Sequence, residues 1–303
     1  MKQTAIIGIV AAVVIAALAT VNAAPSLPNI PKIPKIPGIG GQTGQQIQQG
    51  VNAVNQVNQA NQAWSFKEER GAGRVLAARV ANSFGGIVPQ SSPWSQYVNK
   101  IGRGLAVVSN RPDIKYRFAI LNTDDVNAYS CPGGYIFVTR GLLRSVKSEA
   151  ALAGVLAHEI AHVSEKHIEK AIRKQKVAGV ALEQGLSFAA SEGQISDQQA
   201  DMLKKLGDAG YDILVKKGLD REDELEADRI AVKTMAMMGY NPSEYKAFVG
   251  TLGGKDSKLA VLASTHPAAA DRVKAIEEQI TKKMDGLAVL EERLEAVRKA
   301  SPL

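Results

Sequence analysis

The sequence predicts an α+β fold that is mostly helical, with a small β-sheet beside one central helix. Apolar residues recur at helical spacing through most of the chain after residue 64, which is typical of amphipathic helices. Between residues 115 and 139 the pattern changes to short alternating stretches that carry aromatic residues, and these favour strands. The stretch Ser148–Lys170 follows directly and predicts a long helix, so the sheet is expected beside it.

Composition limits the class of protein. The 303 residues suffice for one large domain or two small ones, with an ample core. The net charge of +7, from 37 basic and 30 acidic residues, is spread along the chain. No basic block is interleaved with aromatic residues, so nucleic acid is not an expected partner. Cys131 is the only cysteine, which excludes an intrachain disulfide.

The first residues are typical of an export signal. Lys2 provides a positive charge, Ile6–Leu18 is apolar, and Val21–Ala23 resembles a cleavage site made of small residues. We therefore expect residues 1–23 to be a signal peptide and the protein to be exported into a bacterial periplasm. The alternative is an uncleaved signal anchor that tethers the chain to the membrane, because the apolar run with its flanks approaches a spanning length.

Residues 24–63 are interpreted as a low-complexity linker. A proline-rich part with a repeated Ile-Pro-Lys favours extended conformations, and a part rich in Gln and Asn follows it. This linker is predicted to be a tether or an interaction arm, and a spacer without a specific partner is an equal alternative. The main folded domain is expected over residues 64–282, followed by a C-terminal helix over residues 283–303.

The elements of the folded part are predicted in chain order. Helices are expected at Glu68–Asn82, Pro93–Ser109, Ser148–Lys170, Arg221–Gly239, Ser243–Leu252, Ala268–Lys282 and Leu287–Lys299. Strands are expected at Lys115–Asn122 and Gly134–Thr139, with an extended segment or turn at Asp124–Ser130 between them. Residues 171–217 favour two further helices with a break near Ser191–Ser196, which would form a helical lid beside a site on the central helix.

The central helix contains His158-Glu159-Ile160-Ala161-His162, an H-E-x-x-H motif. Residues four apart stand about 40° apart around a helix, so both imidazoles project from one face and suit a pair of zinc ligands. Glu159 falls between that face and an apolar stripe, where a carboxylate needs a metal, a water or a partner. A surface helix with scattered polar residues is the alternative, and the agreement between motif and stripe disfavours it.

A hydrolytic zinc site usually has three protein ligands. His167 lies on the far side of an unbroken helix from His158, so it is expected to be a hydrogen-bonding or surface residue. The third ligand is then expected to be a carboxylate of a later helix, and the candidates are Glu222, Asp223, Glu224 and Glu226. Glu224 and Asp228 share a face, so Glu224 can bind the metal while Asp228 orients a ligand histidine. An ordinary charged helix face is the alternative for this stretch taken alone.

Four motifs occur in order along the chain: N-A-x-x-x-P-G-G, then HEIAH, ELEAD and STHP, and the first is matched at Asn127, Ala128, Pro132, Gly133 and Gly134. Together they resemble peptidase family M48, the family of the CAAX prenyl endopeptidases and HtpX-like zinc metallopeptidases. The resemblance covers roughly residues 66–282 and implies a gluzincin-type fold with one Zn²⁺ per chain. It also implies that Glu224 is the third zinc ligand. The segment Asn127–Cys131 would be an edge strand that pairs with the substrate backbone, with Asn127, Ala128 and Tyr129 as the substrate-binding residues.

The expected mechanism follows from these parts. Zinc lowers the pKa of a bound water towards about 7 and polarises the scissile carbonyl. Glu159 then takes the proton of that water and passes it to the leaving amine. The oxyanion needs a donor, for which His266 is the first candidate and Arg272 the second. His266 has two alternatives: a reversible latch in the open zinc position, or a residue that caps or packs against a helix.

The chain differs from the integral membrane members of the family, which carry several spans. It is similar to the exported soluble branch, whose members act on misfolded envelope proteins. The leading expectation is a zinc endopeptidase of protein quality control that cleaves misfolded or unassembled envelope proteins, with envelope or outer-membrane assembly machinery as a partner. The first alternative is a chaperone-like assembly factor with a latched or idle peptidase site. The second is a membrane-anchored structural protein that uses the Gln/Asn-rich arm.

Overall fold

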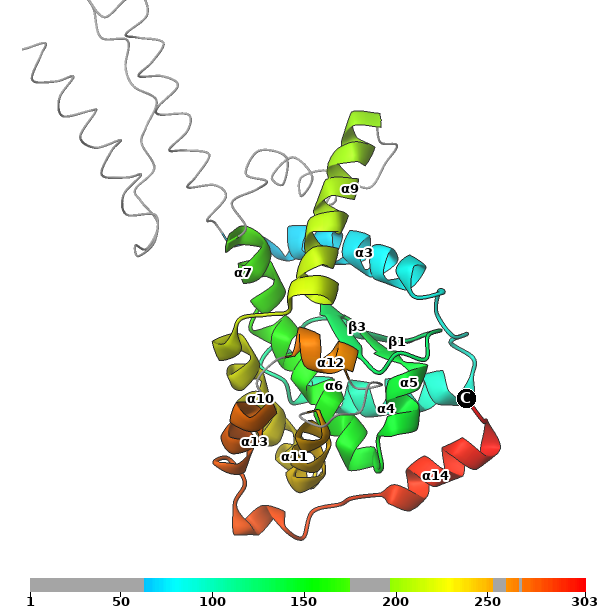
Figure 1. The fold of residues 1–303 in the computed structure, drawn as a ribbon, viewed down its shortest axis with the longest axis vertical. Coiled ribbons are helices and arrows are strands. Elements are labelled where there is room, and N and C mark those ends of the chain that lie inside the picture. The colour runs from blue at the N-terminus through cyan, green and yellow to red at the C-terminus, as the bar shows by residue number, and fades with distance from the viewer. Residues whose placement is uncertain (1–62, 175–196, 253–259, 267–268) are drawn as a thin grey trace, which may run out of the picture.

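The computed structural model describes residues 63–174, 197–252, 260–266 and 269–303 (Figure 1). The predicted signal peptide, nearly all of the predicted linker and the predicted break at Ser191–Ser196 lie outside these residues. The described part is mostly helical with one three-stranded sheet, which confirms the predicted α+β class. Within it, no helix is both long and apolar enough to span a membrane.

The helices account for most of the described chain. They are α3 (Phe66–Ser83), α4 (Pro93–Val107), α5 (Arg140–Ser145), α6 (Glu149–Ser164), α7 (His167–Lys174), α9 (Asp197–Tyr211), α10 (Arg221–Met237), α11 (Pro242–Thr251), α12 (Ala260–Thr265), α13 (Ala269–Glu277) and α14 (Glu291–Ala300). A π-helical turn, η1 (Asp212–Lys217), continues α9, and a 3-10 turn, η3 (Lys282–Met284), precedes α14.

The sheet contains three short strands close in sequence. They are β1 (Arg117–Leu121), β2 (Ala128–Cys131) and β3 (Tyr135–Thr139), in the spatial order β1-β3-β2. β3 pairs with β1 in parallel and with β2 antiparallel, so β2 is an edge strand. Gly133 and Gly134 make the turn between β2 and β3 with φ values of 72° and 93°, which glycine adopts without strain. A Cβ on Gly133 would lie 2.6 Å from the Cα of Arg70, so this turn also requires a small residue.

Helix α6 lies at the centre of the molecule, with α10, α11 and α13 on one side (Figure 1) and the sheet packed against it. All of its residues are buried, and the Ser148 hydroxyl caps its first turn by accepting a hydrogen bond from the Ala151 N–H at 3.1 Å. Small side chains allow this burial, because a Cβ on Gly154 would lie 2.4 Å from Tyr245 of α11. The central helix and the neighbouring sheet therefore agree with the sequence prediction.

The prediction of one long helix over Ser148–Lys170 is wrong in one respect. The helix ends at Ser164, and a second helix begins at His167. Lys166 occupies the break with a left-handed φ of 58°, a conformation that glycine usually provides after a helix. Its ammonium group lies 3.1 Å from Glu169 and 3.6 Å from Glu69, and it donates to the Trp64 carbonyl at 3.3 Å. These contacts hold the strained residue in place and turn α7 away from the axis of α6.

Two smaller differences concern short elements. Residues 140–145 form helix α5, for which the sequence pattern gives no indication. Gly141 permits it, because a Cβ at that position would lie 2.1 Å from the Asp124 carbonyl oxygen. Ser264 and Thr265 end the short helix α12, and the helix expected at Ala268–Lys282 is α13, which ends earlier, at Glu277.

Candidate metal centre

Two histidines and one glutamate meet between α6 and α10. His158 and His162 project from one face of α6, and their Nε2 atoms lie 2.9 Å apart. The Glu224 carboxylate of α10 lies 3.5 Å from each of these nitrogens. Ligand atoms around a tetrahedral zinc ion are separated by about 3.4 Å, and all three side chains are buried. The structure therefore brings together the three residues that the sequence predicts as ligands, in an arrangement that fits a metal ion.

His266 adds a fourth potential ligand. It follows α12, and its Nδ1 lies 2.9 and 3.1 Å from the two oxygens of Glu224. Its Nε2 lies 4.0 Å from Oε1 of Glu159. One ligand atom from each of His158, His162, Glu224 and His266 lies within 4.8 Å of all the others. Three imidazoles and one carboxylate form a donor set that suits zinc.

The electrostatics of these groups explain how a buried carboxylate is tolerated. Burial raises the pKa of Glu224, but His266, His158 and His162 outweigh it and hold that pKa well below its usual range. Burial, together with the neighbouring His158, lowers the pKa of His162 to about 3. Burial and Arg272 also act to lower the pKa of His158, yet hydrogen bonds with Asp228 and Glu224 raise it to about 9. A metal ion at the centre must displace the proton that His158 otherwise binds.

Asp228 holds His158 from behind. Its Oδ1 lies 2.9 Å from the Nδ1 of His158, so an N–H at that position can donate to it and leave Nε2 available for a metal. Arg272 binds both oxygens of Asp228 at 2.8 Å, and the Tyr245 hydroxyl donates to Oδ1 at 2.7 Å. Burial acts to raise the pKa of Asp228, but Arg272 and His158 lower that pKa by more than burial raises it, so the net shift is downward. Tyr245 takes part in this support although no sequence motif indicated it.

His162 has a different support. Its Nδ1 lies 2.8 Å from the Nδ1 of His167, which is fully buried at the start of α7. The Nε2 of His167 lies 3.1 Å from Glu226 and 3.7 Å from Asp223. The expectation that His167 lies on the far side of an unbroken helix is therefore wrong, because the break at Lys166 turns it back. Its expected role as a hydrogen-bonding residue agrees with these contacts.

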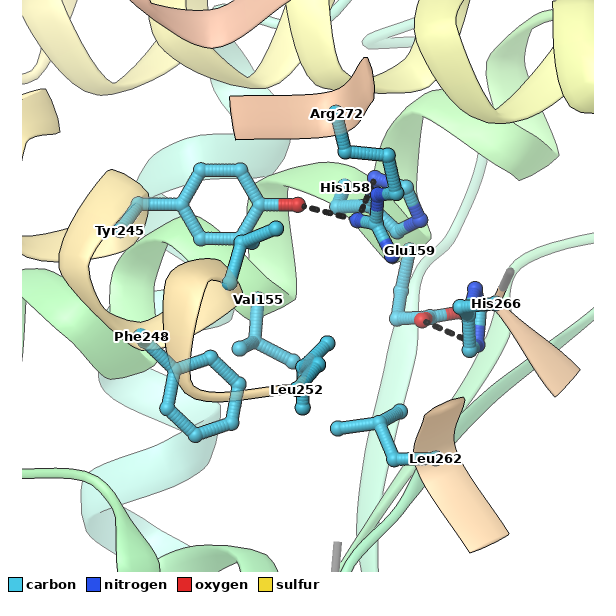
Figure 2. A pocket seen from close by; sticks show the side chains of 10 residues that line it. Val155, His158, Glu159, Tyr245, Phe248, Leu252, Leu262, His266 and Arg272 are labelled. Atoms are coloured by element: carbon cyan, nitrogen blue, oxygen red, sulfur yellow. Dashed lines mark hydrogen bonds and ion pairs between the residues drawn. The ribbon is translucent and has the colours of Figure 1, made fainter. Parts of the chain in front are cut away.

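Glu159 lies beside the face of α6 that carries His158 and His162. Figure 2 shows its carboxylate directed at His266, next to an apolar wall from α6, α11 and α12. The cavity here is lined by Val155, His158, Glu159, Tyr245, Phe248, Val249, Leu252, Leu262, His266 and Arg272. Its volume is about 20 Å³, which is room for about one water. Among the described residues, this cavity leaves no room for a polypeptide beside Glu159.

Arg272 lies behind the ligands. Its guanidinium is buried among Asp228, Tyr245 and Glu224, with Nη1 at 3.4 Å from a Glu224 oxygen. These contacts engage most of its donors and place it on the α10 and α11 side of the centre. The arrangement suits a residue that positions Asp228 and His158.

The edge strand β2 lies on the other side of the centre. Ala128 and Tyr129 line a second small cavity, of about 10 Å³, together with Glu159 and His162. Asn127 is fully buried, and its side-chain oxygen accepts from the backbone N–H of Ala128 at 2.8 Å. Its amide nitrogen donates to the Tyr129 hydroxyl at 2.9 Å and to the Thr265 hydroxyl at 3.4 Å. The predicted substrate-binding strand therefore lies beside the centre. The hydrogen bond between Asn127, directly before the strand, and Thr265 links it to α12.

Comparison with known proteins agrees with this geometry. Peptidase family M48 matches residues 94–280, which is more than half of the chain. The mitochondrial metalloendopeptidase OMA1 of Schizosaccharomyces pombe is 30% identical over 196 residues, which cover 63% of this chain and 55% of OMA1. The β-barrel assembly-enhancing protease of Escherichia coli K12 is 27% identical over 186 residues, covering 59% of this chain and 37% of that protein.

A third relative is of more similar length. The metalloprotease LoiP of Escherichia coli K12 is 23% identical over 196 residues, which cover 64% of this chain and 74% of LoiP. The first two relatives are matched over less than two thirds of their own length. The family match over residues 94–280 contains every residue of the centre described above. The family match, with the H-E-x-x-H helix and its carboxylate partner in place, shows that the chain belongs to peptidase family M48, a family of metallopeptidases.

Proposed function

We propose that this chain is a zinc-dependent endopeptidase. The observation that carries the proposal is the buried convergence of His158, His162 and Glu224, with Glu159 directly beside them. Bound zinc supplies a Lewis acid that polarises a peptide carbonyl and acidifies a water. His158, His162 and Glu224 would hold it, and His266 is a further potential ligand in this conformation.

The residues around the metal ligands have separate tasks in this proposal. Glu159 accepts a proton from the attacking water and returns it to the leaving amine. Asp228 keeps the proton of His158 on Nδ1, and Arg272 positions Asp228. Asn127, Ala128 and Tyr129 are buried in the described conformation and, once the centre opens, would mark the strand edge along which an extended substrate backbone aligns. Arg272 is less suited to the oxyanion, because its donors already face Asp228 and Tyr245.

In the described conformation, the position of His266 favours a latch in the open zinc position over a donor to the oxyanion. Its Nδ1 is 2.9 Å from Glu224, and its side chain closes a cavity that leaves room for about one water. A substrate carbonyl needs that space. His266 must therefore move before hydrolysis, after which its imidazole can donate to the oxyanion.

The proposal also covers the substrates of the chain and its location. We infer that the chain is exported through residues 1–23 into a periplasm and cleaves misfolded or unassembled envelope proteins. A tether formed by an uncleaved signal anchor is the alternative. The name of the relative that enhances β-barrel assembly supports outer-membrane assembly machinery as a partner. The closed cavity separately favours a second function, a chaperone-like assembly factor with a latched peptidase site.

One experiment tests the activity directly. Zinc content and casein cleavage are measured for the full chain and for Glu159→Gln, which keeps the ligand set and removes the base. We expect both proteins to bind one tight zinc and only the first to cleave casein. Full cleavage by Glu159→Gln would refute the proposed mechanism. Suppression of substrate aggregation that survives a chelator, without cleavage, would favour the chaperone-like function.

A further inference from the structure

Outside the metal centre, the described residues contain a second cluster with metal-ligand chemistry. It consists of His167 at the start of α7, and Asp223 and Glu226 on the first turns of α10. One ligand atom from each of the three lies within 4.8 Å of the other two. The Nε2 of His167 is 3.1 Å from Oε2 of Glu226 and 3.7 Å from Oδ1 of Asp223. These separations bracket the spacing of about 3.4 Å between ligands on a tetrahedral zinc ion.

The cluster differs from the inner centre in its access to solvent. The Glu226 side chain is 45% exposed and that of Asp223 is 16% exposed, whereas His167 is fully buried. A cation arriving from solution can therefore reach the carboxylates and keep water ligands on its open side. Two carboxylates with a neutral imidazole carry a net charge of −2, and the nearby Lys170 offsets part of it. One imidazole and two carboxylates form a ligand set that suits Zn²⁺ and similar divalent transition metals.

We propose that His167, Asp223 and Glu226 form an outer binding site for a divalent transition metal, and that its occupation removes the hydrogen bond that orients His162 at the inner centre. The second part of this proposal rests on the proposed function, because it requires His162 to be a ligand of the inner metal. The first part is independent of it.

The coupling follows from where the protons lie between His162 and His167. When His162 binds the inner metal through Nε2, its proton is on Nδ1, and it donates to the Nδ1 of His167 at 2.8 Å. The proton of His167 is then on Nε2, where it donates to Glu226. A metal at the outer site needs that Nε2 lone pair, so the proton of His167 moves to Nδ1. Two N–H groups would then face each other across 2.8 Å, and the hydrogen bond that orients His162 is lost.

Zinc binding tests the outer site. Bound zinc per chain is measured by equilibrium dialysis against rising free ZnCl₂, for the full chain and the double variant Asp223→Asn/Glu226→Gln. Glu222→Gln is the matched control, because Glu222 lies on the same turn with a side chain that is 77% exposed. We expect two zinc ions per chain for the unmodified protein and for Glu222→Gln, and one for the double variant. A single zinc in the unmodified protein, or two in the double variant, would overturn the outer site.

Casein cleavage over the same zinc series tests the coupling. Relative to each protein's own maximum, cleavage should fall as the second zinc binds to the unmodified chain and to Glu222→Gln. The double variant should require at least about tenfold more zinc for the same fall, in line with the effect of losing partners of metal ligands. An equal fall in the double variant would overturn the coupling. Absence of cleavage at every zinc concentration in all three proteins, with two zinc ions bound to the unmodified chain and one to the double variant, would instead count against the proposed function and leave the outer site supported.

Discussion

The two histidines of α6 are supported in opposite ways. His158 rests on Asp228, which has no exposed surface and is held by Arg272 and Tyr245. His162 rests on a second histidine, His167, whose other nitrogen meets a carboxylate that is 45% exposed. The first support consists of buried, charged hydrogen bonds that fix one arrangement. The second ends in solvent, so its hydrogen-bond partners can be changed by what binds there.

One site therefore combines a rigid support for His158 with an adjustable support for His162. A buried charged pair is expensive to break because the remaining partner stays without solvent. A partner at the surface can be replaced by water at little cost. The His158 side should therefore determine whether the centre folds at all, and the His162 side should determine how tightly a metal is held.

Removing Asp228 should have the largest effect. Asp228→Ala leaves Arg272 and Tyr245 buried without their common partner, and we expect a loss of about 3–5 kcal/mol in the free energy of unfolding. Urea denaturation of the metal-free chain measures this loss. Glu222→Ala on the exposed side of α10 is the control and should change the stability by less than about 0.5 kcal/mol. A loss for Asp228→Ala equal to that of the control would remove the proposed contrast.

Replacing His167 should act mainly on metal affinity. His167→Leu removes the acceptor for the Nδ1 proton of His162, and we expect zinc affinity to fall by about 10- to 100-fold. His167→Gln carries an amide oxygen that can accept the same proton, so part of the affinity should return. Competition with a chromophoric chelator measures both variants. Equal loss in the two variants would show that packing, and not the hydrogen bond, is what His167 provides.

Tyr245→Phe should show a smaller effect on the same side as Asp228. The change removes one hydroxyl that donates to Asp228 and accepts from Arg272, while the ring still fills its place against Gly154. We expect a loss of about 1–2 kcal/mol in the free energy of unfolding. The measurement is urea denaturation beside Asp228→Ala. A neutral result would mean that Arg272 alone fixes Asp228.

Glu226→Gln should have the smallest effect when zinc is limiting. The amide oxygen can still accept the His167 proton, and the group is half exposed, so we expect a change in inner-site zinc affinity of less than about threefold. Chelator competition at one zinc per chain tests this. A loss as large as that of His167→Leu would contradict the view that this end of the network is adjustable.

Much of the centre could be predicted because helical spacing determines it. His158 and His162 are one turn apart, as are Glu224 and Asp228, and in each case the structure shows both residues on the predicted side of the helix. The position of His167 could not be predicted by the same rule. It depends on a left-handed Lys166 that is held by Glu69 and Glu169, and the sequence carries no glycine there to indicate the break.

Tertiary contacts explain the other differences. Tyr245 reaches Asp228 only because α11 packs closely on α6 at Gly154, a contact between segments about ninety residues apart in the chain. Helices α5 and α12 are each only six residues long. Elements of that length depend on their surroundings more than on propensity, so their bounds follow from packing that a local pattern does not contain.

The closed cavity has a consequence for the kinetics of inhibition. The cavity that the described residues form beside Glu159 and His266 has space for about one water, so a metal-chelating inhibitor does not fit into that cavity in the described conformation. It can bind only to molecules in which the segment carrying His266 has moved, so its apparent affinity is reduced by the fraction of open molecules. Inhibition should then develop slowly, and its onset rate should reach a plateau as inhibitor concentration rises. That plateau would equal the opening rate of the centre itself.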